Sequence, residues 1–534
     1  MARLFRRVPR YSIGIDFGTT TTRLCYFDNT QELNVPPNIT PIRTLVTPIP
    51  REYGDVKYSW HVGEDVINSH WAHYSLFKLE IGKMQPLELT PRRKPDEKIE
   101  VRPELLAARI MWELYSRAVH DKKELSQIRD VAITVPAEWS AIQRQATIMA
   151  GKIAGFSSVH LIEEPVAAYL AIIASHQSDQ ITNAENILVF DYGGGTLDIT
   201  VIYRPDQGVP YVIGRSMNSG KLGGEAIDVL LTQKVVGSKV WDPLSNRDKR
   251  FLADIIRQMK ESLNPEPGKK PMGAAPWPDE VRLLDNPDII FPENSLVLDQ
   301  KNLDDVLEPI SGEIIKYIDT AIQTARSPKK KISKDDIHAV LLVGGSSYLR
   351  KVQVDIKNYF LGKDFNNGIF LETPERIVAV GAALYKSYID RGQKKFQVHI
   401  PMHTYLEYEI KKNDFRRLPL DDVDNGKLPL KPKPPKTCPI PANEDSINWK
   451  VFQEHTYSTN PERDVIESVK FEKISGKTDR LRLEYEVNTN GILESWKPML
   501  IYRQKTVVKT GSPRQYDWIN KDPIDFSEYG ITKS

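Results

Sequence analysis

Two stretches of this sequence repeat one pattern of residues, and the repeat limits the folds that the chain can adopt. Residues 12–27 read SIGIDFGTTTTRLCYF and residues 187–202 read ILVFDYGGGTLDITVI. Each has an apolar strand, an aspartate, an aromatic residue, a glycine-containing turn and a second, alternating strand. The matching positions are Asp16 with Asp191 and Gly18 with Gly193. We therefore expect a duplicated β-hairpin, with one copy in each half of an α/β region.

The glycines of the two turns favour a particular chemistry. Without a Cβ atom the backbone adopts positive φ, so successive N–H groups can converge on an anion. Two such turns that face each other could hold a polyphosphate, and Mg²⁺ would relieve the repulsion between the phosphates and the carboxylates of Asp16 and Asp191. Neither turn has the spacing GxxxxGK[ST] or GxGxxG. The repeat predicts a magnesium nucleotide site, whereas either turn alone could be an ordinary tight hairpin.

A third glycine pair follows another apolar strand. Residues 339–351 read AVLLVGGSSYLRK, a strand that ends at Gly344 and Gly345. Ser346 and Ser347 are helix-cap candidates, so a helix N-terminus would point into the cleft. We expect the backbone here to approach a purine or its ribose; a routine strand-to-helix turn is the alternative.

Composition limits the class of protein. The chain has 534 residues, 40% of them hydrophobic, enough for more than one core. Its formal net charge of +2 predicts no nucleic-acid partner, and the basic residues 1–10 are expected to form a solvated tail. No run of 18 apolar residues occurs, so we expect no membrane span and a cytoplasmic protein. The two cysteines, Cys25 and Cys438, favour a reducing compartment without disulfides.

The pattern changes at about residue 391. Over residues 11–391 short apolar runs alternate with segments of helical periodicity, as in α/β layers. Residues 402–534 contain stretches with a period of two, which predict a smaller antiparallel β domain. We place a linker at residues 392–401 and an extended proline-rich connection at residues 428–441. Residues from Lys497 onward are expected to form an edge or a tail.

Several motifs follow one another in a familiar order. They are GIDFGTTTT, VAITVPAEWSAIQRQATIMAGKIAGF, LIEEPVAAYLA, VFDYGGGTLDI, KLGGEAID, LLVGGSSYLRKV and PERIVAVGAALY. Together they resemble the nucleotide-binding domain of the DnaK-type heat-shock chaperones, within the superfamily of actins, sugar kinases and chaperone ATPases. The resemblance covers residues 11 to about 388. It implies an α/β fold: an actin-like two-lobed ATPase domain with duplicated βαβ cores, followed by a smaller antiparallel β-sandwich.

The resemblance also implies roles for individual residues in a slow hydrolysis of ATP. Lys78 would steady the γ-phosphate and the attacking water, and Glu164 would orient that water. The implied catalytic set is Lys78, Glu164, Thr196 and Asp191, and the implied magnesium-associated residues are Asp16 and Asp191. The implied contacts with ATP or ADP are Asp16, Gly18, Thr19, Thr20, Gly193, Gly194, Gly195, Asp198, Gly223, Gly224, Lys260, Gly344, Gly345 and Ser346. Pro136 and Arg144 match positions that relay the nucleotide state to the next domain.

The C-terminal part resembles the peptide-binding β-sandwich of the same family. Residues 479–496, DRLRLEYEVNTNGILESW, would form a hairpin that turns at Asn490 and Gly491. The implied partners are an unfolded or extended polypeptide, or one dedicated protein. The resemblance also implies J-domain and nucleotide-exchange co-chaperones, and we expect the chain to be a monomer. The last residues, NKDPIDFSEYGITKS, predict no helical lid, so a bound peptide should exchange quickly.

Three substitutions depart from the family pattern. Glu261 and Tyr348 stand where the family has arginines beside the purine, and Tyr348 would be free to stack on the base. His160 stands where the family docks J-domain partners through an arginine. We therefore keep two hypotheses: an ATP-dependent chaperone whose β domain binds polypeptide, and a nucleotide-sensing scaffold with a dedicated partner. A small-molecule kinase is disfavoured, because QRQAT, EEPVAAY and LGGEAID are chaperone features.

Overall fold

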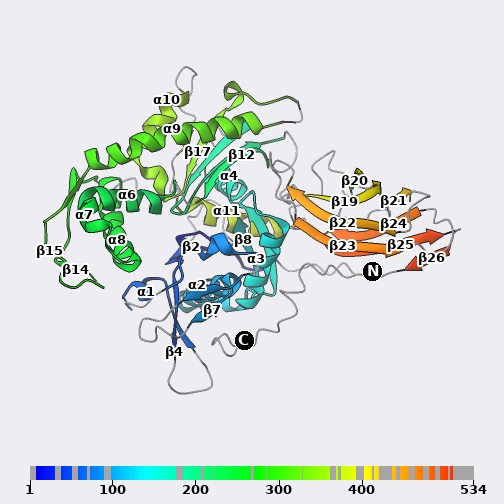
Figure 1. Cartoon of the computed structure of the whole chain (residues 1–534), viewed down its shortest axis with the longest axis horizontal. Helices are drawn as coiled ribbons and strands as arrows, with labels where there is room; N and C mark the ends of the chain where they lie inside the picture. Colours follow the sequence, from blue (N-terminus) through cyan, green and yellow to red (C-terminus); the bar gives the residue numbers. More distant parts are fainter. Residues whose placement is uncertain are drawn as a thin grey trace.

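The structure of the chain is a computed structural model, in which two lobes of sheets and helices are followed by further strands (Figure 1). It describes residues 8–30, 38–50, 58–68, 73–83, 85–89, 98–175, 184–205, 210–219, 222–265, 270–283, 285–327, 329–360, 369–370, 375–392, 402–411, 414–419, 436–439, 446–455, 464–472, 480–487, 493–502 and 505–508.

Each lobe is built on a sheet with the same strand arrangement. The order is β3-β2-β1-β8-β9 in the first lobe and β12-β11-β10-β17-β18 in the second. In both, a three-stranded antiparallel meander is extended by two parallel strands. The bounds are β1 Tyr11–Asp16, β2 Thr21–Asp28, β3 Asn38–Arg43, β8 Asp130–Val135 and β9 Ser158–Glu163, then β10 Asn186–Tyr192, β11 Thr196–Tyr203, β12 Tyr211–Ser219, β17 Ala339–Val343 and β18 Ile369–Phe370. The predicted duplication is confirmed by these described strands.

Two helices join the lobes. Helix α4 (Glu164–Ser175) follows the first sheet but packs on strands of the second, whereas α11 (Ile377–Asp390) follows the second sheet and packs on the first. The two helices also contact each other, and one apolar core contains residues from both helices and both sheets. A Cβ atom at Gly381 would overlap the backbone of Ala167, so the helices can approach this closely only with glycine there.

The remaining described elements cover these sheets. In the first lobe they are β4 Val46–Pro50, β5 Tyr58–Val62, α1 Glu64–Asn68, η1 Phe77–Glu80, β6 Leu87–Leu89, β7 Ile99–Val101, α2 Pro103–Asp121, η2 Lys123–Gln127 and α3 Ala141–Ile153. In the second they are α6 Gly224–Val236, α7 Ser238–Trp241, α8 Asn246–Leu263, β13 Ala274–Pro276, β14 Val281–Arg282, β15 Ile290–Phe291, β16 Val297–Asp299, α9 Gln300–Thr324, η3 Lys334–Asp336, η4 Gly345–Tyr348 and α10 Arg350–Phe360. Helix α3 starts at a capping box formed by Ser140 and Gln143.

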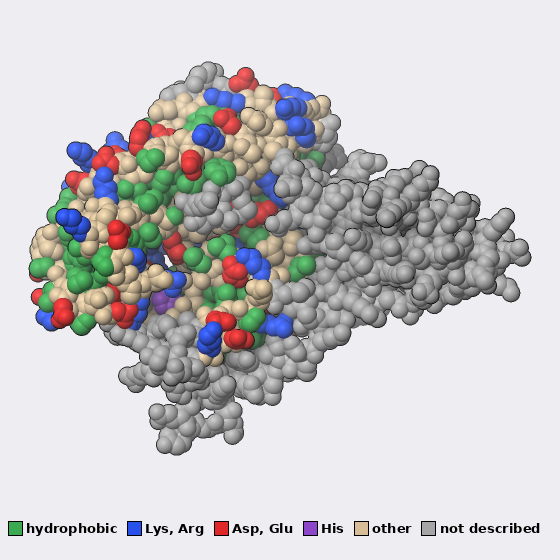
Figure 2. All heavy atoms as spheres, in the orientation of Figure 1, with side chains coloured by type: hydrophobic (Ala, Val, Ile, Leu, Met, Phe, Trp, Pro, Cys, Tyr) green, Lys and Arg blue, Asp and Glu red, His purple; other side chains and the backbone are tan. Residues whose placement is uncertain are grey.

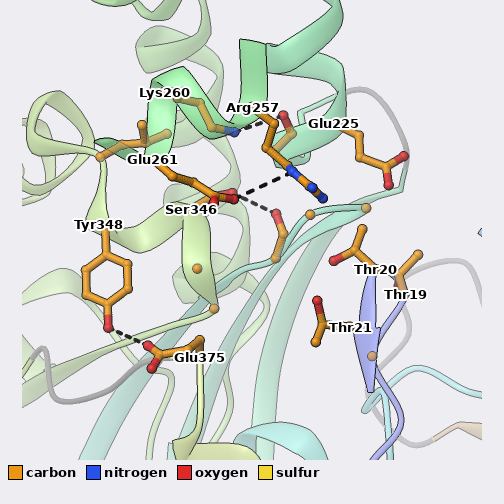
Figure 3. Close-up of a pocket in the computed structure, with 18 of the residues that line it drawn as sticks. Thr19, Thr20, Thr21, Glu225, Arg257, Lys260, Glu261, Ser346, Tyr348 and Glu375 are labelled. Carbon is orange, nitrogen blue, oxygen red and sulfur yellow. Dashed lines mark hydrogen bonds and ion pairs between the residues drawn. The ribbon is translucent and has the colours of Figure 1, made fainter. Parts of the chain in front are cut away.

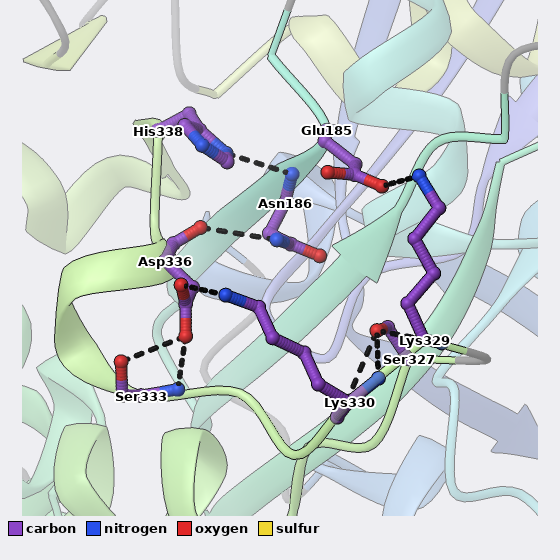
Figure 4. Close-up of polar contacts among 8 residues, drawn as sticks. All are labelled: Glu185, Asn186, Ser327, Lys329, Lys330, Ser333, Asp336 and His338. Atoms are coloured by element: carbon purple, nitrogen blue, oxygen red, sulfur yellow. Dashed lines mark hydrogen bonds and ion pairs between the residues drawn. The ribbon is translucent and has the colours of Figure 1, made fainter.

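Polar contacts fix the start of β10 against the start of β17 (Figure 4). The backbone N–H of Asn186 donates to Nδ1 of His338 at 3.2 Å, and Nδ2 of Asn186 donates to the carbonyl of Asp336 at 3.1 Å. The carboxylate of Asp336 in turn accepts from Ser333 and from Lys330. These contacts hold in place the two strands whose far ends carry the second and third glycine motifs.

Beyond residue 401, the described strands form two four-stranded antiparallel sheets. Their orders are β20-β19-β22-β23 and β21-β24-β25-β26. The bounds are β19 Met402–Lys411, β20 Asp414–Pro419, β21 Lys436–Pro439, β22 Ser446–His455, β23 Asp464–Glu472, β24 Arg480–Val487, β25 Leu493–Tyr502 and β26 Lys505–Val508. Antiparallel pairing was expected, but a β-sandwich and a domain boundary at residue 391 stay predictions. Residues 393–401 and the predicted turn at Asn490 and Gly491 lie outside the described residues.

One segment differs from its prediction. Residues 436–439 belong to the proline-rich connection, yet they form β21, which pairs with β24. The strand lies at the edge of its sheet, and Pro439 is its last residue, so a missing N–H is tolerated there.

The described surface mixes charges of both signs. Figure 2 shows Lys and Arg side chains interspersed with Asp and Glu over the described part of one face. Among the described helices, none combines the length and the apolar character needed to cross a bilayer.

Candidate functional site

The two glycine-rich turns touch each other. The first follows β1 and the second follows β10, at equivalent places in the two lobes. A Cβ atom built on Gly194 would lie 2.5 Å from Cγ2 of Thr20, and one built on Gly195 would lie 2.5 Å from Cγ2 of Thr19. Any larger residue at either glycine would push the turns apart. The predicted facing of the two turns is therefore present in the structure.

A third segment closes against the second turn. The N–H of Gly224, at the start of α6, donates to the carbonyl of Gly193 at 3.0 Å, and Oγ of Ser346 donates to the same carbonyl at 3.0 Å. A Cβ atom on Gly223 would lie 2.5 Å from the carbonyl oxygen of Gly194. Gly344 has a φ of 80°, which favours glycine. The second and third glycine motifs thus form one continuous wall.

The prediction that serines cap a helix in this wall is wrong. Residues Gly345–Tyr348 form a single 3₁₀ turn, and α10 begins only at Arg350. The hydroxyl of Ser347 donates to the carbonyl of Val343 at 2.5 Å, which directs it back toward the end of β17. The cause is the extra turn between the strand and the helix, which moves the helix start beyond both serines.

Asp16 and Asp191 end the two equivalent strands. Burial, followed by the charge of Glu164, raises the pKa of Asp16 to about 6. Burial, Glu164 and Asp16 raise the pKa of Asp191. No cluster of three or more His, Cys, Asp or Glu side chains that could hold a metal occurs among the described residues. Because the charge of Asp16 raises the pKa of Asp191, the two carboxylates repel each other, and such a pair fits Mg²⁺, which takes phosphate oxygens and waters as further ligands and would relieve the repulsion.

Lys78 and Glu164 form a buried ion pair beside these aspartates. Lys78 lies in η1, and Glu164 is the first residue of α4, where the following proline suits a helix start. Nζ of Lys78 lies 2.6 Å from Oε1 of Glu164. Burial works to lower the pKa of Lys78, but the charges of Glu164, Asp16 and Asp198 outweigh it and raise that pKa.

Thr196 and Asp198 lie on the strand that leaves the second turn. Thr196 lines the cleft, whereas Asp198 does not. Asp198 is the register partner of Asp191, and Oδ1 of Asp198 is buried without a hydrogen bond from any described residue. Burial raises the pKa of Asp198, and the charges of Glu138 and Asp191 raise it further.

These residues line a cleft of about 790 Å³ between the lobes. Of the predicted site residues, the lining includes Asp16, Gly18, Thr19, Thr20, Lys78, Glu164, Asp191, Gly193, Gly194, Gly195, Thr196, Gly224, Lys260, Gly344, Gly345 and Ser346, and leaves out Asp198 and Gly223. Figure 3 shows Thr19, Thr20 and Thr21 on one side of the cleft and Ser346 with Tyr348 on another. The geometry thus brings together nearly all the residues that the sequence singled out.

Two side chains at the end of the cleft where the sequence predicts the nucleoside are engaged in contacts within the protein. Lys260, a predicted contact with the nucleotide, has its Nζ atom 2.6 Å from Oδ1 of Asp228. The hydroxyl of Tyr348 donates to Glu375 (Figure 3). Tyr348 was expected to be free to stack; its hydroxyl is engaged by this hydrogen bond, and stacking of its ring on the base stays a prediction.

The predicted relay positions are linked by hydrogen bonds. Arg144 is fully buried and donates to the carbonyls of Ala137 and Trp139, and its Nη2 atom lies 2.8 Å from Oε1 of Glu163. The N–H of Trp139 donates to the carbonyl of Pro136. Arg144 therefore anchors the loop after β8 to the strand that leads into α4 and Glu164.

His160, at the predicted J-domain position, is half-buried and paired. Its Nε2 atom lies 3.0 Å from Oδ1 of Asp130, and Nζ of Lys386 lies 3.2 Å from Oδ2 of the same carboxylate. Burial alone would raise the pKa of Asp130, but His160 and Lys386 outweigh it and lower that pKa to about 2. The carboxylate of Asp130 thus ties β8 to β9 and to α11.

A comparison with protein families decides the relationship of the chain. The family described as Hsp70 protein matches residues 83–497. The chain belongs to the Hsp70 family. This confirms the DnaK-type resemblance, and the mixed α/β lobes fit the actin-like ATPase domain of Hsp70 proteins.

Curated chaperone proteins are similar to this chain over 70% of its length. It is 31% identical over 396 residues to "Chaperone protein dnaK" of Cyanidioschyzon merolae, which is 70% of this chain and 61% of that protein. It is 28% identical to "Chaperone protein DnaK" of Thermosipho africanus and 27% identical to "Chaperone protein HscA homolog" of Acinetobacter baumannii, covering 58% and 57% of those proteins. The chain therefore matches about three-fifths of the length of these relatives.

Several cleft residues were not predicted from the sequence. They are Arg23, Arg43, Glu225 and Arg257. For Arg23 a signal existed, because the repeat that aligns Asp16 with Asp191 also aligns Arg23 with Asp198. The other three, Arg43, Glu225 and Arg257, lie in β3, α6 and α8. In these elements the periodicity of the sequence does not show which residues face the cleft.

Proposed function

We propose that this Hsp70-family chain binds and hydrolyses ATP with Mg²⁺ and couples its nucleotide state to the binding of polypeptide by its C-terminal strands. The supporting observation is the contact of the two turns, Gly194 against Thr20 and Gly195 against Thr19, above a pair of aspartates. This arrangement offers backbone N–H groups to a polyphosphate from both lobes. The cleft volume of about 790 Å³ suits a nucleotide.

In the proposed reaction, water attacks the γ-phosphorus and ADP and phosphate leave. Asp16 and Asp191 would hold Mg²⁺, which supplies neutralisation of charge on the phosphate oxygens. Lys78 would add a second positive charge beside them, and Glu164 would orient the attacking water through hydrogen bonding. Because phosphoryl transfer depends mainly on positioning and charge, no side chain needs to act as the nucleophile.

The coupling to polypeptide rests on different support. The relatives carry the word chaperone in their names. Arg144 ties Glu163, next to the proposed water-orienting Glu164, to the loop after β8. We propose that this loop passes a change at the γ-phosphate on toward the C-terminal strands. We also propose a cytoplasmic location, because Cys25 is a buried free thiol.

Phosphate release from ATP, measured with and without an extended apolar peptide, tests this function. We expect slow turnover that requires Mg²⁺ and rises with peptide. If the protein binds ATP but its turnover does not change when peptide is added, this result contradicts the coupling and favours the nucleotide-sensing scaffold. Absence of nucleotide binding would overturn the proposal as a whole.

A further inference from the structure

Arg23 occupies a position in the cleft that the function proposed above does not use. It lies on β2, directly opposite Asp16 in the antiparallel register of the first hairpin. Residues opposite each other in such a pair project to the same face of the sheet. Both residues line the nucleotide cleft. The equivalent pair in the second lobe is Asp191 with Asp198, so the first lobe presents a cation where the second presents a carboxylate.

The guanidinium of Arg23 makes no hydrogen bond or ion pair with any described residue, whereas three other cations of the cleft are paired with carboxylates. Lys78 pairs with Glu164 and Lys260 pairs with Asp228, each at 2.6 Å. Arg43 pairs with Asp254 at 3.1 Å. An arginine remains protonated at neutral pH, so Arg23 adds to the cleft a positive charge that no ion pair with a described residue engages.

The surroundings of Arg23 indicate where its side chain reaches. The charges that act most strongly on it are those of Asp16 and Glu375, and Tyr348 also acts on it. Glu375 and Tyr348 belong to the nucleoside end, where they are hydrogen-bonded to each other. Glu375 also pairs with Arg376 at 3.1 Å, so it does not need Arg23 as a partner. Arg23 thus lies between the phosphate turns and the nucleoside end.

The α-phosphate of a nucleotide bound in this cleft would lie beside Arg23. Its terminal phosphates would occupy the two glycine-rich turns, and its nucleoside would lie along Gly344, Gly345 and Ser346. The group that joins the two is the α-phosphate, which is an anion with oxygens that match the fork of a guanidinium.

We propose that Arg23 binds the α-phosphate of the nucleotide and is a binding residue of the cleft in addition to the glycine-rich turns. This inference rests on the proposed nucleotide function and deepens it. Because AMP, ADP and ATP share the α-phosphate, Arg23 strengthens the binding of all three, and ADP keeps the contact after hydrolysis. Adenosine lacks the phosphate and gains nothing.

Competition against a fluorescent ADP derivative tests the proposal on the full chain. We expect Arg23→Ala to weaken AMP, ADP and ATP about 10- to 100-fold, as for loss of a charged hydrogen bond, with adenosine unchanged. Arg23→Lys, which keeps the charge without the fork, should recover part of the loss. Arg10→Ala is the control, because Arg10 lies at the other end of the same hairpin and pairs with Asp28.

Each other outcome has a definite meaning. If Arg23→Ala weakens adenosine as much as AMP, Arg23 shapes the cleft and does not bind phosphate, and the inference fails. Unchanged affinity for AMP and ADP also overturns it while leaving the nucleotide function intact. If the unaltered chain binds none of the nucleotides, the proposed function itself fails. Thermal unfolding of the nucleotide-free variants shows whether a loss of binding reflects loss of folding.

Discussion

The Nζ atom of Lys78 lies 2.6 Å from the Oε1 atom of Glu164, although 86 residues separate the two in sequence. Both side chains are almost completely buried, at 4% and 8% exposure. Removing two charges from water costs several kcal/mol, so a buried pair of this kind is weak evidence of a stabilising role. The pair favours a chemical role instead, because it lies beside Asp16. The charge of Glu164 raises the pKa of Asp16, and the charge of Lys78 lowers it.

Replacement of Lys78 by alanine should abolish ATP turnover while leaving nucleotide binding. Glu164 would also lose its partner inside the protein, so we expect the free energy of unfolding to fall by about 3–5 kcal/mol. Single-turnover hydrolysis, ADP titration and urea unfolding measure the three quantities. The control is Lys83→Ala, since the Lys83–Glu80 pair is exposed and worth less than about 1 kcal/mol. Turnover at the original rate would defeat the assigned role.

Replacement of Gly195 by alanine should separate the two turns. The added Cβ atom would lie 2.5 Å from Thr19, which is closer than real contacts allow, so the turns could no longer enclose a polyphosphate. We expect the affinity for ADP to fall at least about tenfold, measured by calorimetry. Gly312→Ala is the matched control, because Gly312 lies in α9 with open space around it, and alanine there should add stability of about 1 kcal/mol. Equal binding in both variants would contradict the packing argument.

The duplicated hairpins could be predicted from sequence because each is a local pattern. The strand, the aspartate, the turn and the second strand are neighbours in the chain, so their spacing carries the information. The contact of Gly195 with Thr19 could be anticipated only because the repeat gave two copies to place face to face. In contrast, the meeting of Lys78 with Glu164 depends on how α4 packs, and only the family resemblance indicated it.

Other residues show what local patterns leave out. Ser347 looked like a helix cap because serine before a helical segment usually is one, but a 3₁₀ turn intervenes and its hydroxyl bonds to Val343. The repeat aligns Arg23 with Asp198, but the two side chains differ in charge, so the similarity between the two copies does not extend to this position. Arg43 and Asp254 are 211 residues apart, and no sequence period connects them.

Glu225 should make the nucleotide-free protein less stable as pH rises from about 4.5 to 7. Burial, with the charges of Asp228 and Asp254, outweighs Arg43 and Arg257 and raises the pKa of Glu225 to about 7. Between the ordinary value of 4.5 and 7, the folded state then holds more protons than the unfolded state, so stability falls with rising pH, by at most about 1.4 kcal/mol per pH unit.

Comparing Glu225→Gln with the unaltered chain isolates this effect from the other buried carboxylates. The variant should be the more stable of the two at pH 7.5 and should lose that advantage near pH 4.5, as measured by urea unfolding without nucleotide. Glu261→Gln serves as the control on the same side of the cleft, because its side chain is 66% exposed. Parallel pH profiles for Glu225→Gln and the unaltered chain would refute the expectation.

Arg43 and Asp254 connect the two lobes across the cleft. Arg43 ends β3 in the first lobe, and its Nη2 atom lies 3.1 Å from Oδ1 of Asp254 in α8 of the second. Nη2 of Arg257 lies 3.6 Å from the same oxygen, so one carboxylate is shared by guanidinium groups of both lobes. Opening of the cleft to release ADP has to separate Arg43 from Asp254, whereas Arg257 moves with it.

We therefore expect Arg43→Ala to speed the release of ADP more than it changes ADP association. A partly exposed pair of this kind is worth about 0.5–1 kcal/mol, which corresponds to an increase of about two- to fivefold in the dissociation rate. Stopped-flow displacement of a fluorescent ADP measures that rate. Arg247→Ala is a close control, since Arg247 and Asp285 are also 3.1 Å apart and similarly exposed but lie within one lobe. If both variants release ADP at the same rate, the pair between the lobes does not restrain opening of the cleft.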